Sequence, residues 1–235
     1  MSVPESRLVP APARFSDGVR AAVPVVLGYV PIGFAFGVLA RTAGLTVAEI
    51  GLMSIIVYAG SAQFIGAGMF AAGAAAPAII STTFLVNLRH LLMSTALAPS
   101  FRETSAWENA LLAYGITDET FAVSSSVLQG RPASPGYIAG LHVTSQSSWV
   151  LASVAGALAG QMVGNTQRLG LDFALTAMFI GLLMPHFRGA GHAARIMAGV
   201  VAGIVAVVAA AFLGLSSWAI IAATLVAATV GVMVE

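Results

Sequence analysis

The sequence predicts an all-helical membrane protein, a bundle of about seven or eight transmembrane helices. Of its 235 residues, 58% are hydrophobic and only 8% are charged, whereas a soluble domain carries about 25% charged residues. Apolar stretches of roughly 20 residues, long enough to cross a bilayer, recur along the chain. Such a small number of charged residues cannot keep a protein surface in water. We therefore expect most of the surface of this protein to face lipid.

Short polar connections separate the apolar stretches. The polar residues 1–17 precede the first of them, so we expect a short flexible cytoplasmic tail and then a single transmembrane domain over residues 18–235. The expected segments are residues 19–40, 47–72, 78–98, 108–128, 136–163, 171–185, 195–213 and 216–234.

The first segment contains residues that interrupt helices. Pro24 and Pro31 each lack a backbone donor and clash with the carbonyl four residues earlier, so we expect the helix to kink or to be discontinuous there. The free ends of two half-helices would bind a carboxylate or an ammonium group, which makes Gly28, Tyr29, Pro31 and Gly33 candidate binding residues. Alternatively, Gly33 and Gly37 are a pair of small residues that pack helices together.

The second segment begins with a predicted capping box, Thr46 with Glu49. Small and polar residues follow in mid-segment, where they admit another backbone and offer an amide. Interhelical hydrogen bonding is one explanation. We favour a binding site, because two other polar clusters also need a cavity. The candidates are Gly60, Ser61, Gln63 and Phe64.

The third segment carries Asn87, Arg89 and His90 inside an apolar run. A charge at bilayer depth costs roughly 2.5–3.5 kcal/mol, so Arg89 needs a partner. We expect it to pair with Asp118 or Glu119, or with the carboxylate of a solute; the alternative is that it snorkels to the membrane surface. Asn87 is a further binding candidate. His90 is a candidate proton carrier, because imidazole titrates near neutral pH.

Two adjacent acids, Asp118 and Glu119, interrupt the fourth segment. A helix that faces lipid would not tolerate them, so either this helix is discontinuous and re-entrant, giving seven spans, or one face lines a cavity. Both acids are candidates for proton coupling, and both equally suit a helix cap.

Several function classes are excluded or disfavoured. The chain has no cysteine, and His186 and His192 lack neighbouring ligands, so we expect no metal or cofactor. A protease built on Ser61 and His142 lacks a Gly after the serine, so we expect no enzyme. No phosphate-binding loop motif occurs, so ATP is not the direct driver. The net charge of +1 implies no nucleic-acid partner.

Arginine placement favours a cytoplasmic N-terminus. With eight spans, six arginines fall on the side of the tail and three on the other side. The six are Arg7, Arg14, Arg20, Arg131, Arg188 and Arg195, and the three are Arg41, Arg102 and Arg168.

Five stretches, taken in order and spacing, closely resemble the AzlC family, also called YgaZ. They are Gly28–Gly37, Tyr58–Phe64, Thr82–Met93, Thr117–Phe121 and Gly170–Ala174. The resemblance implies a multi-pass permease of the cell inner membrane for branched-chain amino acids, mostly an exporter. It also implies a small membrane partner of the AzlD (YgaH) type.

The residues agree with that implication. A zwitterion uses polar partners for both of its charges, and Phe34, Phe36 and Phe64 are candidates for an apolar side-chain pocket. We therefore expect a secondary, proton-coupled transporter that exports branched-chain amino acids. The alternative is a channel for another small solute.

Overall fold

A computed structural model describes most of the chain. The described residues are 14–102, 104–128, 132, 134–160, 173, 190–212, 226–227, 229–230 and 233. Apart from isolated positions, the segments expected at 171–185 and 216–234 lie outside the described residues, as does most of the expected tail.

The described elements are all helices, as predicted, and the chain divides into two compact units, residues 1–175 and 176–235. The second unit contains α11 (Ala190–Phe212). The first unit contains α1 (Phe15–Ala21), α2 (Val23–Thr42), α3 (Val47–Ile56), α4 (Gly60–Ala71), α5 (Ala76–Asn87), α6 (Arg89–Leu97), the 3-10 turn η1 (Ala98–Phe101), α7 (Ala106–Tyr114), α8 (Asp118–Leu128) and α9 (Pro135–Gly160).

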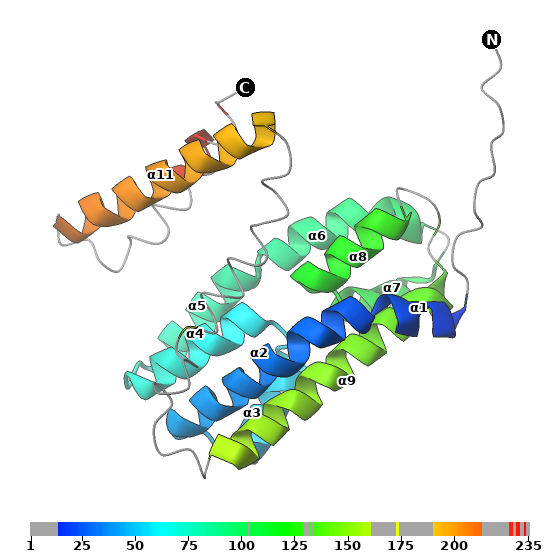
Figure 1. Ribbon diagram of the computed structural model, residues 1–235, viewed down its shortest axis with the longest axis horizontal. Coiled ribbons are helices and arrows are strands. Elements are labelled where there is room, and N and C mark those ends of the chain that lie inside the picture. The colour runs from blue at the N-terminus through cyan, green and yellow to red at the C-terminus, as the bar shows by residue number, and fades with distance from the viewer. Residues whose placement is uncertain are drawn as a thin grey trace. The chain divides into compact units, whose positions relative to one another are not determined.

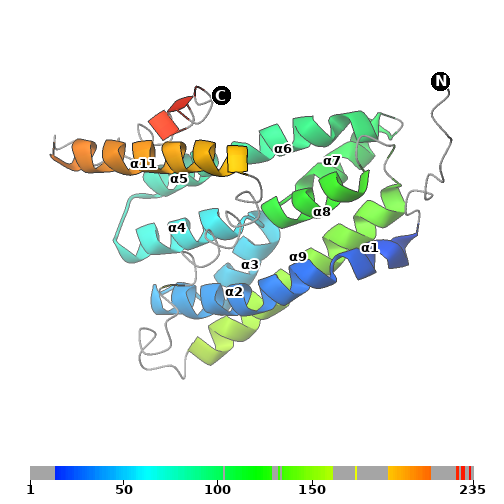
Figure 2. The ribbon, with the colours of Figure 1, turned by 45° about the horizontal axis from the view of Figure 1, so that its top comes forward.

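In the first unit, α1 and α2 lie along α9 and run in the same direction (Figures 1 and 2). Glycines allow the backbones to touch. A Cβ atom built on Gly18 would lie 2.0 Å from the carbonyl oxygen of Tyr137, and one on Gly37 would lie 2.0 Å from that of Ser153. Small residues therefore set the helix spacing here, which is the packing role that the sequence offered for Gly37.

The expected discontinuity at Pro31 is not found. Instead, α2 runs from Val23 to Thr42 as one helix that includes Pro31. The missing N–H of Pro31 removes only one backbone hydrogen bond from the helix. Tyr29 and Gly33, on either side of the proline, both pack against Trp149 of α9. This support keeps the helix continuous, so the structure frees no half-helix ends there.

A single helix over residues 47–72 is also wrong, because α3 and α4 form a hairpin. The Gln63 amide nitrogen donates to the Ser54 hydroxyl at 3.1 Å, and Gly66 faces the end of the Met53 side chain. In one straight helix, Ser54 and Gln63 would be about 13 Å apart along the axis. The break covers residues 57–59, where Tyr58 adopts a φ of 42°.

A second hairpin is formed by α7 and α8, with residues 115–117 between them. The side chain of Asn109 in α7 donates to the Phe101 carbonyl at the end of η1, so α7 turns back along α6. Leu128 at the end of α8 packs in one cluster with Leu97 and Phe101. Since Asp118 at the start of α8 reaches Arg89, α8 runs parallel to α6.

Both hairpins begin with a capping box. The predicted box of Thr46 and Glu49 is confirmed, and Ser105 and Glu108 form a second one before α7. In each box the hydroxyl accepts from the glutamate N–H, and the carboxylate accepts from the backbone N–H of the cap. These bonds hold the pKa of both carboxyls below the usual value for glutamate.

The helices α5 and α6 follow one another across a bend at Leu88 and antiparallel to α2 (Figure 2). Two described stretches, Val23–Thr42 and Ala76–Phe101, are long and apolar enough to cross a membrane. No residue of α5 is buried, although the helix is apolar, which suits an element that faces lipid.

We expect Gly37→Ala to destabilise the protein by about 1–3 kcal/mol or more, because the new methyl group meets a backbone oxygen that cannot rotate away. Gly28→Ala is the matched control on the same helix: a Cβ there meets nothing within 4 Å, and alanine favours the helix. Thermal unfolding in detergent measures both. Equal melting temperatures for the two variants would contradict this packing.

Candidate functional site

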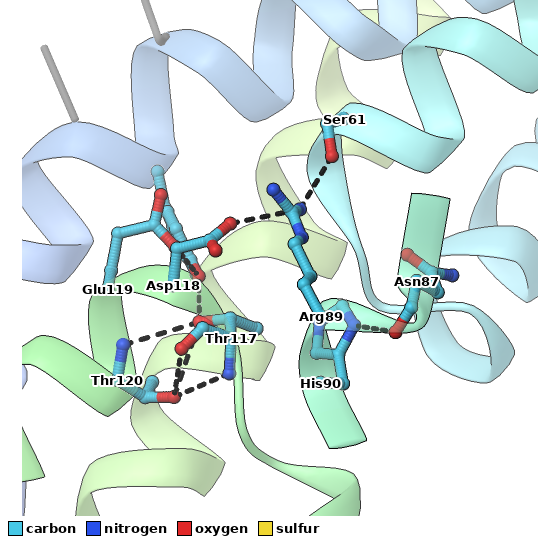
Figure 3. Close-up of polar contacts among 9 residues, drawn as sticks. Ser61, Asn87, Arg89, His90, Thr117, Asp118, Glu119 and Thr120 are labelled. Atoms are coloured by element: carbon cyan, nitrogen blue, oxygen red, sulfur yellow. Dashed lines mark hydrogen bonds and ion pairs between the residues drawn. The ribbon is translucent and has the colours of Figure 1, made fainter. Parts of the chain in front are cut away.

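The breaks of both hairpins meet the middle of α5–α6, and most of the predicted polar residues gather there (Figure 3). The start of α4 contributes Ser61, and the start of α8 contributes Asp118 and Glu119. The bend between α5 and α6 contributes Arg89. Segments far apart in the sequence thus build one polar centre inside an apolar protein.

Arg89 joins the two hairpins. Its Nη2 atom donates to the Ser61 hydroxyl at 2.6 Å and lies 2.9 Å from the Asp118 carboxylate. The Arg89 and Asp118 side chains are 28% and 23% exposed. As expected, the arginine has an internal counter-charge. Its Nε atom is buried and has no hydrogen-bond partner among the described residues.

Tyr29 makes a second connection, between α2 and the start of α8. Its hydroxyl lies 2.6 Å from the Thr117 hydroxyl and donates to the Glu119 carboxylate at 2.8 Å. Thr117 and Thr120 cap α8 reciprocally: each side-chain oxygen accepts from the other residue's backbone N–H. The predicted candidates Tyr29, Asp118 and Glu119 are therefore brought together.

Asn87 and His90 lie on a different side of the bend from the Arg89 contacts (Figure 3). The Nδ1 atom of His90 is 3.0 Å from the Asn87 carbonyl oxygen. Both residues line a cavity with Tyr58. The three polar residues of this segment thus point into two neighbouring parts of the centre, as the 100° rotation per residue requires.

Other predicted residues serve packing. The Gln63 amide is fully buried, donates to Ser54 and accepts from Trp149 Nε1 at 3.0 Å. Phe64 packs edge-on against Phe36, with ring centres 5.5 Å apart. Both contacts lie in the core cluster between α2, α4 and α9.

The remaining candidates lie apart from the polar centre or at its edge. Pro31 is exposed and Phe34 is 37% exposed. Gly28 has open space around it, whereas Gly33 packs on α9. Gly60 is the first residue of α4.

Tyr58, Tyr114 and Thr117 belong to the centre but were not among the candidate residues predicted from the sequence. Tyr58 and Tyr114 lie at the two breaks with ring centres 6.3 Å apart, and the Tyr114 hydroxyl bonds the Ile55 carbonyl. A tyrosine directly before a glycine or a small residue in each polar stretch was the available signal. It does not reveal that the two stretches meet.

The centre offers partners for both signs of charge. The first turn of α4 has no capping side chain, so its N–H groups and Arg89 favour an anion. Asp118 and Glu119 favour a cation. No group of three or more His, Asp or Glu residues that would hold a metal occurs in the described part of the chain.

Comparison with known proteins places these residues in a family. The model of the family described as AzlC protein matches residues 24–163, which include α2 to α9 and the whole polar centre. The chain belongs to the AzlC family. The resemblance carried by its motifs is thereby confirmed.

Relatives in this family are membrane proteins by name. The inner membrane protein YgaZ of Escherichia coli is 33% identical over 196 residues, 80% of this chain and 79% of that protein. An uncharacterized membrane protein of Archaeoglobus fulgidus is 34% identical over 91% of this chain and 92% of its own length. The branched-chain amino acid transport protein AzlC of Bacillus subtilis is 28% identical over 72% of this chain and 66% of its own length. No solved structure matches.

We expect Gln63→Leu to cost about 1–3 kcal/mol of stability, because it leaves the buried Trp149 N–H and Ser54 hydroxyl without a partner. Gln146→Leu is the control; Gln146 is partly exposed and bonds Tyr114 at the protein surface. Thermal unfolding in detergent reports the difference. An unchanged melting temperature for Gln63→Leu would show that its amide is not structural.

Proposed function

We propose that this protein is a secondary transporter of branched-chain and similar apolar amino acids, working by alternating access in the cell inner membrane. The observation that carries the proposal is the position of Arg89, held between the starts of α4 and α8. The name of the Bacillus subtilis relative supports the class of substrate. The centre supports a zwitterion, because it holds partners for both charges.

We propose that α3–α4 and α7–α8 enter the membrane from opposite sides and return without crossing it. In the first unit the membrane spans are then α1–α2, α5–α6 and α9, fewer than the sequence predicted there. This topology puts Arg14, Arg20 and Arg102 at one end and Arg41 at the other. The arginine bias favours the first end as cytoplasmic, with the N-terminus inside.

The contacts of Arg89 support a transporter rather than a channel. Arg89 of α6 bridges the two hairpins through its ion pair with Asp118 and its hydrogen bond to Ser61. A solute then passes only after these contacts exchange, which is the behaviour of an occluded site. We propose export as the direction and an AzlD-type subunit as the partner, as the family resemblance implies.

We expect cells that contain the protein to release leucine and valine faster after loading with a branched-chain dipeptide. Arg89→Ala should abolish the increase, because the carboxylate loses its cation. Arg41→Ala is the matched control; its side chain bonds the Leu45 carbonyl at the end of α2. The same efflux measurement in cells with and without an AzlD-type subunit shows whether the chain transports alone.

The double variant Arg89→Ala with Asp118→Ala separates folding from transport, because it leaves no unpaired charge. It should insert normally and remain inactive. Normal efflux by Arg89→Ala, or no efflux by the wild-type protein with its subunit present, would overturn the proposed function.

We further propose that Glu119 carries the coupled proton. It has no ion-pair partner among the described residues, so a proton can join it without breaking the Arg89–Asp118 pair. Glu119→Gln should flatten the dependence of leucine efflux on pH, measured between about pH 5.5 and 8.5. Asp118→Asn and His90→Gln should keep the dependence. A pH profile of Glu119→Gln equal to that of the wild type would exclude this role.

A further inference from the structure

A cavity of about 230 Å³ lies between the breaks of the two hairpins. Tyr58 lines it from the first hairpin, Tyr114 from the second, and Asn87 and His90 from the bend of α5–α6. Its walls combine ring faces with a few polar atoms, as small-molecule sites do.

Tyr58 differs from the other lining residues in its backbone conformation and in its buried hydroxyl. It is 3% exposed, and its hydroxyl has no hydrogen-bond partner among the described residues. Its φ of 42° is a conformation that aromatic residues rarely adopt. Strained backbone that holds an unsatisfied polar group is typical of functional sites, and Tyr58 is one of the residues that line the cavity.

Two more buried polar atoms lack partners on the same bend. Asn87 Oδ1 is an acceptor and Arg89 Nε is a donor, and neither has a partner among the described residues. His90 adds a second acceptor: if its Nδ1–H donates to the Asn87 carbonyl, its Nε2 carries a lone pair. Asn87 and His90, which line the cavity, therefore carry acceptors, and Arg89 lies between them in the chain.

This arrangement matches the two ends of an α-amino acid. The ammonium group needs acceptors, and the adjacent carboxylate needs a donor. We propose that the α-amino group of the transported amino acid binds in this cavity, against the Tyr58 hydroxyl and Asn87 Oδ1, while the carboxylate takes Arg89 Nε. The inference rests on the proposed transport function and assigns the orientation of the substrate.

The test compares Tyr58→Phe with Tyr137→Phe. Tyr137 is also buried and its hydroxyl also lacks a partner among the described residues, but it packs in the cluster with Leu97 and Leu128 and is not among the residues that line this cavity. Phenylalanine keeps the ring and the backbone preference at either position. Both variants are measured in the full chain by leucine efflux and by thermal unfolding.

The Tyr58→Phe change should raise the half-saturating leucine concentration about tenfold or more, because a hydrogen bond to a charged group is lost. Inhibition by 4-methylpentanoate, which has the leucine side chain and carboxylate but no amino group, should stay unchanged. Tyr137→Phe should change neither value.

Two results overturn the orientation while wild-type transport stands. One is an unchanged half-saturation for leucine in Tyr58→Phe. The other is an equal loss of affinity for leucine and 4-methylpentanoate, which would indicate a change of shape and not of amino-group recognition. Absence of leucine transport by the wild-type protein overturns the proposed function itself, and the orientation with it.

Discussion

The cation of Arg89 is the constraint on which the rest of the first unit depends. A guanidinium in an apolar interior is stable only where acceptors and a counter-charge are fixed around it. Ser61 and Asp118 supply them from two different hairpins. Both hairpins must therefore turn back at the same depth, and the bend at Leu88 must present Arg89 between them.

The two hairpins are built by the same steps. Each begins with a capping box, continues through a short helix of 10 (α3) or 9 (α7) residues, breaks for three residues, and ends in a helix of 12 (α4) or 11 (α8) residues. Each final helix runs parallel to the long element before it, α4 to α2 and α8 to the bent pair α5–α6. Because α2 and α6 are antiparallel, the two halves have opposite directions, the arrangement known as an inverted repeat.

The sequence predicted the local features and missed the ones that depend on tertiary contacts. Apolar length and the Thr46–Glu49 pair were enough to predict a helical protein and the start of α3. The charge of Arg89 was enough to predict a partner among two acids. Apolar length alone could not predict the α3–α4 hairpin, because both of its helices continue one apolar run, and only the Gln63 bonds to Ser54 and Trp149 show the reversal. Pro31 failed as a signal because packing on α9 outweighs one lost hydrogen bond.

The two halves of the repeat are α1–α4 and α5–α8. The long element of each half contacts the hairpin of the other half. Tyr29 of α2 bonds the start of α8, while Arg89 of α6 bonds the start of α4 and the start of α8. Moving either hairpin thus breaks an ion pair or a hydrogen bond unless another group replaces it. In the proposed orientation a zwitterion has partners for both of its charges here, Arg89 for the carboxylate and the acceptors of Tyr58 and Asn87 for the ammonium. An ion of one sign would leave one of the two charges unpaired in a low-dielectric interior, which is costly. The Arg89–Asp118 pair therefore supports the proposal that the solute is an amino acid and not a simple ion.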